Sequence, residues 1–257
     1  MALCRDDSEK VREYYGKVLA GKKDLQTNAC CTADAVSARF RDLLNNIEGE
    51  ILDRFYGCGA PLPEALEGAT VLDLGCGTGR DVYLAAQLVG PEGRVIGVDM
   101  TPEQLEVGER LLKTQMRRFG YLQPNVKFVH GYIEDLETAG IEDNSVDVVI
   151  SNCVINLSPD KERVFAEIFR VLKPGGEMYI ADVFADRRLP VEMRDDPVLL
   201  GECLGGAMYL EDFRRCLARL GCADPREVSR AAITIENEDI ESRIGMARFD
   251  SVTVRAF

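Results

Sequence analysis

The sequence has very little histidine, no tryptophan and no cysteine spacing typical of a zinc site. His130 is the one histidine among 257 residues, and none of the nine cysteines forms a Cys-x-x-Cys pair. Because structural zinc sites are built from such closely spaced ligands, structural zinc is not expected. The scarcity of histidine also makes a histidine general base improbable, although transfer to oxygen or nitrogen commonly needs one.

Long apolar runs are absent as well. No segment approaches the ~20 residues needed to span a bilayer, and the first ten residues, MALCRDDSEK, lack the apolar core of a signal peptide. With 31 basic and 44 acidic residues the net charge is −13, so neither nucleic acid nor a membrane is expected as a partner. We expect a cytoplasmic monomer whose cysteines are reduced thiols.

The composition is that of a folded chain, with 46% hydrophobic and 29% charged residues and no obvious linker. We expect two regions. Residues 1–67 form an N-terminal helical extension and lid that carries Cys30 and Cys58, and residues 68–257 form the main domain. In the extension, Ser8 can cap a first short helix, and apolar residues at three- and four-residue steps between Val36 and Ile51 predict a second.

After Gly68, short β runs alternate with segments of helical length. Strands are predicted at 70–74, 94–98, 126–130, 146–151 and 177–183, and helices at 80–89, from 102 onward, at 158–172 and at 210–220. Two last strands, near 231–236 and 251–255, are expected to form an antiparallel hairpin at one edge. This alternation predicts an α/β fold with a seven-stranded, doubly wound, mostly parallel sheet.

A glycine-rich loop follows the first of these strands. Its glycines are Gly75, Gly77 and Gly79, with Asp73 two residues upstream. Such a loop could hold either a dinucleotide or S-adenosylmethionine. The dinucleotide fingerprint needs a glycine at its sixth position, where this chain has Arg80 or Val82. The spacing therefore does not fit a dinucleotide.

The two acidic residues near this loop favour S-adenosylmethionine. Asp73 would repel a pyrophosphate but suits the ammonium group of a methionine moiety. Asp99, at the end of the second strand, can accept hydrogen bonds from both ribose hydroxyls. We therefore expect S-adenosyl-L-methionine as the cofactor. The alternative to an active enzyme is a protein of the same fold that binds the cofactor but has lost catalysis.

The loop, Asp99, the strand with Asp147 and the segment 172–176 together resemble the seven-stranded S-adenosylmethionine-dependent methyltransferases. This resemblance implies that Ile133 packs on the adenine ring and that Glu134, or its backbone, meets the exocyclic amine. His130 is expected to be a hydrogen-bonded residue at a strand end. The remaining residues expected to bind the cofactor are Tyr56, Met100, Gln104 and Asn152.

Three cysteines lie where core packing explains them poorly. Cys58 is flanked by Gly57 and Gly59, Cys153 follows the fourth strand directly, and Cys203 lies in a glycine-bracketed segment after the fifth. Glycine neighbours contribute almost no apolar volume, so we expect these thiols to take part in chemistry. The cysteines expected to be structural are Cys4, Cys76, Cys216 and Cys222.

The segments 14–16, 24–30, 56–59, 151–157 and 201–207 together resemble the arsenic(III) S-adenosylmethionine methyltransferases, over nearly the whole chain. The resemblance implies that Cys58, Cys153 and Cys203 hold trivalent arsenic, delivered as arsenite or its thiol conjugates. Arsenic(III) is soft and prefers sulfur. Its lone pair would be the nucleophile, so no general base is required.

The resemblance further implies that Cys30 forms a transient disulfide with Cys58, which thioredoxin or glutathione then reduces. The adjacent Cys31 leaves open which of the two thiols does this. Family members often continue beyond the equivalent of Phe257, which leaves the product range open. Two other functions are compatible with the sequence. One is a methyltransferase of the same fold that acts on another small molecule and whose cysteines are incidental. The other is a thiol module that binds metalloids without catalysis, but such a module would need neither Asp73 nor Asp99.

Overall fold

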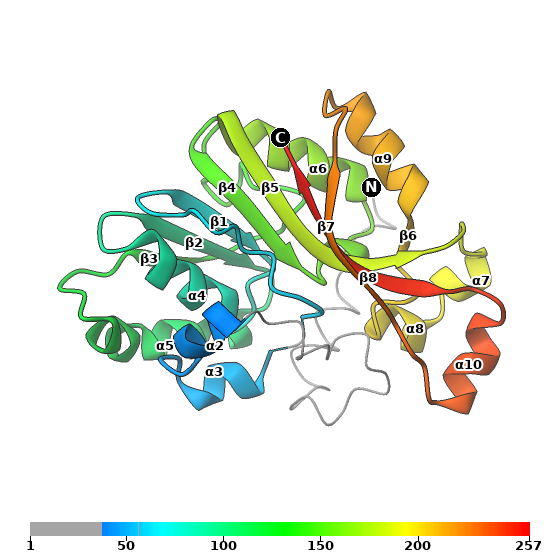
Figure 1. Cartoon of the computed structure of the whole chain (residues 1–257), viewed down its shortest axis with the longest axis horizontal. Helices are drawn as coiled ribbons and strands as arrows, with labels where there is room; N and C mark the ends of the chain where they lie inside the picture. The colour runs from blue at the N-terminus through cyan, green and yellow to red at the C-terminus, as the bar shows by residue number, and fades with distance from the viewer. Residues whose placement is uncertain (1–37, 56) are drawn as a thin grey trace.

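A twisted sheet of eight strands forms the centre of the computed structural model, which describes residues 38–55 and 57–257 (Figure 1). The strands are β1 (Thr70–Leu74), β2 (Arg94–Asp99), β3 (Val126–His130), β4 (Val146–Asn152), β5 (Leu172–Ala185), β6 (Met208–Tyr209), β7 (Arg226–Ala232) and β8 (Phe249–Ala256). The helices are α2 (Ala38–Leu44), α3 (Gly49–Asp53), α4 (Arg80–Val89), α5 (Pro102–Phe119), the 3-10 turn η4 (Ile155–Leu157), α6 (Lys161–Val171), α7 (Val191–Arg194), α8 (Pro197–Gly201), α9 (Leu210–Arg219) and α10 (Glu238–Ile244).

The strand order β3-β2-β1-β4-β5-β8-β7 confirms the doubly wound, mostly parallel sheet. Strands β1 to β5 run parallel, while β8 pairs antiparallel with both β5 and β7. The order reverses between β1 and β4, and a crevice opens beyond the carboxyl ends of the strands at such a switch point. The two-residue β6, which pairs with the end of β5, was not expected and brings the strand count to eight.

Helices cover both faces of the sheet because successive side chains of a strand point to opposite sides. Val71 and Val95 pack with α4 and α5, and the first helices α2 and α3 join this layer. Leu72 and Ile96 face the opposite side, where α6 and α9 lie (Figure 1). The described part of the predicted extension is therefore packed on the main domain.

A third apolar cluster lies beyond the carboxyl end of the sheet, against α8 and α10. It contains Cys58, Cys153 and Cys203 together with residues from the ends of β5 and β8. Segments from the extension, from β4 and from the region after β5 meet in this one place. The fold thus brings together cysteines that are distant in the sequence.

The helix expected between Val36 and Ile51 is broken, and Gln115 explains the break. Helix α2 ends at Leu44 and α3 begins only at Gly49. The Gln115 side chain is fully buried; it donates to the carbonyl oxygen of Asn46 at 3.2 Å and accepts from the N–H of Glu48 at 3.2 Å. A side chain from α5 thus replaces hydrogen bonds that a continuous helix would have made.

Other boundaries differ in the last third of the chain. Strand β7 spans Arg226–Ala232 rather than 231–236, and β5 runs from Leu172 to Ala185, well beyond the expected 177–183. Helices α7, α8 and α10 have four to seven residues, too few for a clear apolar period, and were not predicted.

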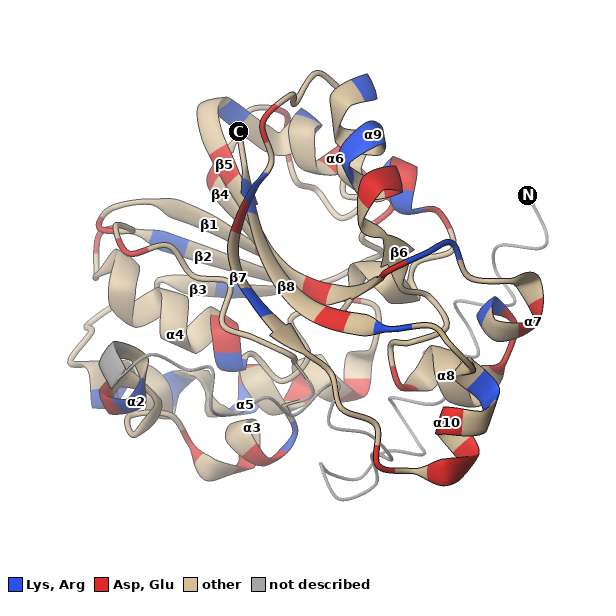
Figure 2. Ribbon diagram, turned by 45° about the vertical axis from the view of Figure 1, so that its right-hand side comes forward, with Lys and Arg blue, Asp and Glu red and all other residues tan. Residues whose placement is uncertain are grey.

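Acidic and basic residues are interleaved along the ribbon (Figure 2). Many of them form ion pairs on the surface, as Arg188 does with Asp212 and Arg219 with Glu162. Exposed pairs of this kind contribute little to stability. Among the described residues, no helix has the length and apolar character needed to cross a membrane.

Candidate active site

A cavity opens at the carboxyl ends of β1, β2 and β4, and together with the open solvent at its mouth it holds about 1030 Å³ of empty space. Nine of the residues expected to bind the cofactor line it: Asp73, Gly75, Gly77, Asp99, Met100, Gln104, Ile133, Glu134 and Asn152. Gly79 is not among the lining residues, and Tyr56 lies outside the described residues. The sequence pattern and the cavity therefore point to the same place.

The glycines of the loop have different tasks. Gly77 has φ +54°, and a Cβ there would have no atom within 4 Å, so its open side faces the cavity. Gly75 and Gly79 also have positive φ, but added Cβ atoms would collide with Val154 and Phe128 respectively. A ligand can therefore approach the backbone closely at Gly77, whereas Gly75 and Gly79 are needed for local packing.

Buried carboxylates surround this loop. Asp73 is 3% exposed; burial raises its pKa well above the usual range, and the charges of Asp81 and Asp99 raise it further. Burial also raises the pKa of Asp99, although this carboxylate accepts from the N–H of Gly77 and of Thr101, each at 2.8 Å. The cavity is thus prepared for a cationic group beside Asp73.

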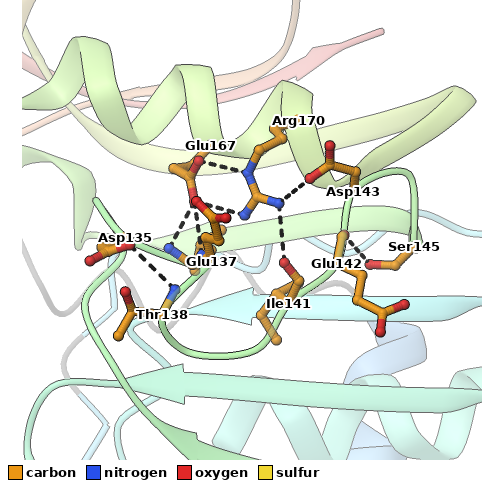
Figure 3. Close-up of polar contacts among 10 residues, drawn as sticks. Asp135, Glu137, Thr138, Ile141, Glu142, Asp143, Ser145, Glu167 and Arg170 are labelled. Atoms are coloured by element: carbon orange, nitrogen blue, oxygen red, sulfur yellow. Dashed lines mark hydrogen bonds and ion pairs between the residues drawn. The ribbon is translucent and has the colours of Figure 1, made fainter.

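The loop after β3 is held to α6 by two side chains (Figure 3). Glu167 accepts hydrogen bonds from the backbone N–H groups of Leu136 and Glu137, at 2.8 and 3.2 Å. Arg170 pairs with Glu167 and donates to the carbonyl oxygen of Ile141. These contacts hold in place the loop whose residues Ile133 and Glu134 line the cavity.

The two residues of that loop are placed differently. Ile133 is 8% exposed and lines the cavity with its apolar side chain. The Glu134 carboxylate accepts a hydrogen bond from the hydroxyl of Ser158, so its side chain already has a partner. His130 contacts the carbonyl oxygen of Met100 at 3.2 Å, as expected of a satisfied strand-end histidine.

The three cysteines singled out from the sequence meet beside this cavity. Cys58 and Cys153 are joined by a disulfide with a Cα–Cα distance of 6.0 Å, and the Cys203 thiol donates to the carbonyl oxygen of Cys153 at 3.6 Å. Their exposed fractions are 1%, 4% and 0%. The three cysteines are therefore shielded from solvent. Cys153 also lines the cavity.

Two of these cysteines have an unusual backbone conformation. Cys153 has φ 56° and Cys203 has φ 60°; among the described non-glycine residues, only Asn144 shares a positive φ. This region costs a non-glycine residue roughly 1–2 kcal/mol. Glycine would avoid that cost at either position, so backbone conformation does not explain why cysteine is found there.

The disulfide differs from the expected one. Cys58 was expected to pair with Cys30, which lies outside the described residues together with Cys31 and Cys4; in the structure Cys58 pairs with Cys153. In this state no group of three or more His, Cys, Asp or Glu side chains in residues 38–55 and 57–257 is arranged to hold a metal ion. Two of the three sulfurs expected to bind arsenic are engaged with each other.

Asn152 holds the segment that carries Cys58. Its Oδ1 accepts from the N–H groups of Cys58 and Gly59 at 3.0 and 3.2 Å, and its Nδ2 donates to the Gly59 carbonyl and to Asp81 at 2.9 and 2.8 Å. A Cβ at Gly57 would lie 2.6 Å from the Asn152 side chain. The amide thus fastens the Cys58 segment over the end of β4.

Asn152→Ala should therefore weaken arsenite binding by about 10-fold or more, because several buried hydrogen bonds that orient Cys58 are lost. Asn152 was expected to bind the cofactor, but its amide oxygen and nitrogen each make two hydrogen bonds within the protein. Binding of S-adenosylhomocysteine should therefore change by less, since the glycine loop and Asp99 are untouched. Titration of each ligand into the reduced variant measures both effects. An equal loss for the two ligands would instead make Asn152 a general support of the cavity.

The other cysteines in the described residues are also buried. Cys216 and Cys222 belong to the apolar core beneath α9, whereas Cys76 packs against Gly97 and lines the cavity near Asp73 and Asp99. Asp147 lies at the opposite end of β4, where it binds Lys173 and the N–H of Thr70. It stabilises the fold rather than the cavity.

Two charged residues at the start of α4 line the cavity although the sequence pattern did not predict them as part of the site. Arg80 and Asp81 are 5% and 4% exposed, and both line the cavity. The Arg80 guanidinium stacks on the Phe55 ring at 3.6 Å and has its Nε 3.4 Å from Asp81. No spacing rule marks such a pair, because its burial depends on the segment before β1.

Comparison with known proteins places these observations in one family. A family model described as a methyltransferase domain matches residues 65–242. An arsenite methyltransferase of Aquipseudomonas alcaligenes is 52% identical over 97% of this chain and 71% of that protein, and one of Mus musculus is 48% identical over 100% and 69%. The crystal structure of an arsenic(III) S-adenosylmethionine methyltransferase from Chlamydomonas reinhardtii superposes with a TM-score of 0.83, at 50% identity, covering 87% of this chain and 74% of that one.

Proposed function

The chain belongs to the arsenite methyltransferase family, and we propose that it transfers the methyl group of S-adenosylmethionine to trivalent arsenic held by the thiolates of Cys58, Cys153 and Cys203. One observation carries the assignment of these residues. Cysteines separated by 95 and 50 residues in the sequence meet in one buried cluster beside the cofactor cavity. This convergence supports a single arsenic site.

The cavity fits the cofactor. The open side of Gly77 leaves room for a ligand against the backbone, Asp73 is a buried partner for an ammonium group, and Asp99 stands at the end of β2. S-adenosylmethionine supplies, when bound, an electrophilic methyl group on a sulfonium. The role of the chain is to fix the amino acid end and the ribose and to keep water out of the adjoining pocket.

The thiolates suit the substrate. Trivalent arsenic prefers sulfur ligands, and three of them leave its lone pair free to act as the nucleophile. No proton has to be removed from that nucleophile, which is consistent with the placement of His130 against the Met100 carbonyl rather than at the cysteines. The chain's own work is to hold arsenic and aim it at the cavity.

Turnover tests the proposal. Protein kept reduced and supplied with arsenite and S-adenosylmethionine should release methylated arsenic and S-adenosylhomocysteine in proportion. A reduced, folded protein that binds S-adenosylhomocysteine yet forms no methylated arsenic would contradict the proposed activity.

Cofactor affinity should rise with pH because of Asp73. In the ligand-free protein its raised pKa favours the protonated carboxyl, whereas an ammonium ligand prefers the carboxylate, so binding at low pH must expel a proton. Asp73→Asn should bind S-adenosylhomocysteine more weakly and lose this part of the pH dependence. Calorimetry across pH measures it. 5′-Methylthioadenosine, which lacks the amino acid group, serves as the control and should not show the Asp73 effect.

The remaining expectations form part of the same proposal. Attack by the arsenic lone pair on the methyl group formally raises arsenic from +3 to +5. Two electrons from the thiolates of Cys30 and Cys58 would return it to +3 as these two cysteines form a disulfide, and thioredoxin or glutathione would then reduce that bond. A monomer in the cytoplasm is part of the same proposal, because nine cysteines that work as thiols suit a reducing compartment.

A further inference from the structure

Strand β4 separates from β5 at Cys153, and two polar side chains take over the hydrogen bonds that the strand gives up. The N–H of Cys153 still donates to the carbonyl oxygen of Ala181 at 2.8 Å, as in a continuous sheet. Two residues further along β5, the N–H of Val183 donates to Asp182 Oδ1 at 2.8 Å, and the Val183 carbonyl oxygen accepts from Asn156 Nδ2 at 2.6 Å. The two side chains thus satisfy the edge of β5 where β4 turns away.

Asp182 also holds the residues at which the chain turns, here called the Cys153 turn (residues 153–157). Its Oδ1 accepts from Asn156 Nδ2 at 2.8 Å, and its Oδ2 accepts from the N–H of Asn156 at 3.2 Å. Both side chains are 2% exposed. A carboxylate buried this deeply is costly unless its oxygen atoms are hydrogen-bonded, and here both oxygens bind the Cys153 turn.

The segment that carries Cys203 packs against the Cys153 turn. The Cys203 thiol donates to the carbonyl oxygen of Cys153 at 3.6 Å. Three residues later, a Cβ at Gly206 would collide with the carbonyl oxygen of Asn156, so glycine lets the two backbones approach closely. The position of Cys203 therefore depends on the same turn that Asp182 holds.

We propose that Asp182 is a positioning residue of the arsenic site: by holding the Cys153 turn, it sets where the Cys203 sulfur lies relative to the Cys153 sulfur. This inference rests on the proposed function, in which both sulfurs bind one arsenic atom. Asp182 is not among the residues that line the cofactor cavity. Its loss should therefore affect arsenic binding far more than cofactor binding.

Asp182→Asn removes the carboxylate without changing the size of the side chain. The N–H of Val183 and both nitrogen atoms of Asn156 donate to Asp182. An amide has one oxygen atom where the carboxylate has two, so at least one of these donors would face another donor. The Cys153 turn should shift as a result.

Asn125→Asp is the matched control, because it makes the reverse exchange far from the cysteines. Asn125 is 6% exposed and directly precedes β3, at the end of the sheet opposite the cavity. Its Nδ2 donates to the carbonyl oxygens of Ala86 and Gly90 at 3.0 and 2.9 Å. A carboxylate there would face two acceptors, so this variant should lose thermal stability as Asp182→Asn does.

The test is calorimetric titration of the reduced protein with arsenite and, separately, with S-adenosylhomocysteine. Burial raises the pKa of Asp182 to about 7, so a buffer of about pH 8.5 keeps it ionised. Asp182→Asn should bind arsenite about 10- to 100-fold more weakly, the usual cost of losing a residue that orients a ligand, and should bind S-adenosylhomocysteine with the wild-type affinity. Asn125→Asp should bind both ligands as the wild-type protein does.

Arsenite binding by Asp182→Asn at the wild-type affinity would overturn the inference, and so would the same selective loss in Asn125→Asp. Equal weakening of both ligands in Asp182→Asn would also overturn it, because that is the effect of a residue that only supports the fold. If Asp182→Asn does not fold, Asn156→Ala decides: weaker binding of arsenite alone supports the inference, and any other pattern contradicts it. Failure of the wild-type protein to bind arsenite would contradict the proposed function itself.

Discussion

Replacing Cys153 or Cys203 with serine should lower the rate of arsenite methylation by at least about 100-fold. Changes to groups that merely support a ligand commonly cost 10- to 100-fold, and these variants remove a ligand itself. A serine hydroxyl is a hard donor that arsenic(III) binds poorly. Methylated arsenic released by reduced protein at saturating S-adenosylmethionine measures the loss.

Cys216→Ser is the matched control for this prediction. Cys216 is 3% exposed, like Cys153 and Cys203, but it packs with Phe213 and Leu217 in the core below α9. All three variants bury a hydroxyl and share that destabilising effect, so thermal stability should fall in each while methylation is lost only at Cys153 and Cys203. Near-normal turnover by either site variant would mean that two sulfurs suffice, and the arsenic assignment would fail.

Protein that carries the Cys58–Cys153 disulfide should neither bind nor methylate arsenite. The bond engages two of the three sulfurs, and a disulfide sulfur lacks the negative charge of a thiolate ligand. Reduction should restore both activities together. Binding of S-adenosylhomocysteine should change little, because the glycine loop and Asp99 do not depend on that bond.

The disulfide can be identified by counting thiols before and after reduction. The Cys58→Ser, Cys153→Ser double variant should gain two fewer thiols than the wild-type protein does, since its other cysteines are the same. An equal gain in the two proteins would place the reducible bond elsewhere, and arsenite binding by the untreated protein would show that oxidation leaves the site intact.

Burial links these two predictions. Each of the three cysteines is nearly inaccessible to water, so arsenic bound among them would be shielded from hydroxide and other competing ligands. The same burial makes each ligand hard to replace, because solvent cannot easily take a vacant position. A dry pocket also strengthens the electrostatic effects that act on a cationic methyl donor.

Local signals account for the part of the fold that the sequence predicted well. Strand β1 and helix α4 end where the glycine loop and Gly90 interrupt them, and both matched the expected bounds. Spacing predicted the glycines at 75 and 77 and the acids at 73 and 99 as one group, and all four line the cavity because each lies at or near a strand end. Such features depend on a few consecutive residues.

The features that escaped prediction depend on contacts across the chain. Helix α2 stops at Leu44 because Gln115, from α5, takes over the next hydrogen bonds. The Cys58–Cys153 pairing joins residues 95 apart, and the residue type of Cys203 gives no sign of its positive φ. The burial of Arg80 likewise could not be predicted, because its guanidinium stacks on Phe55, which lies 25 residues earlier in the sequence.

One arsenic atom should bind the sulfur atoms of Cys58, Cys153 and Cys203 at the same time. X-ray absorption spectroscopy at the arsenic edge can count these sulfurs in reduced protein loaded with one equivalent of arsenite. We expect three sulfur neighbours in the wild-type protein and only two in Cys203→Ser. One or two sulfurs with oxygen in the wild-type protein, or a spectrum that Cys203→Ser leaves unchanged, would contradict this expectation.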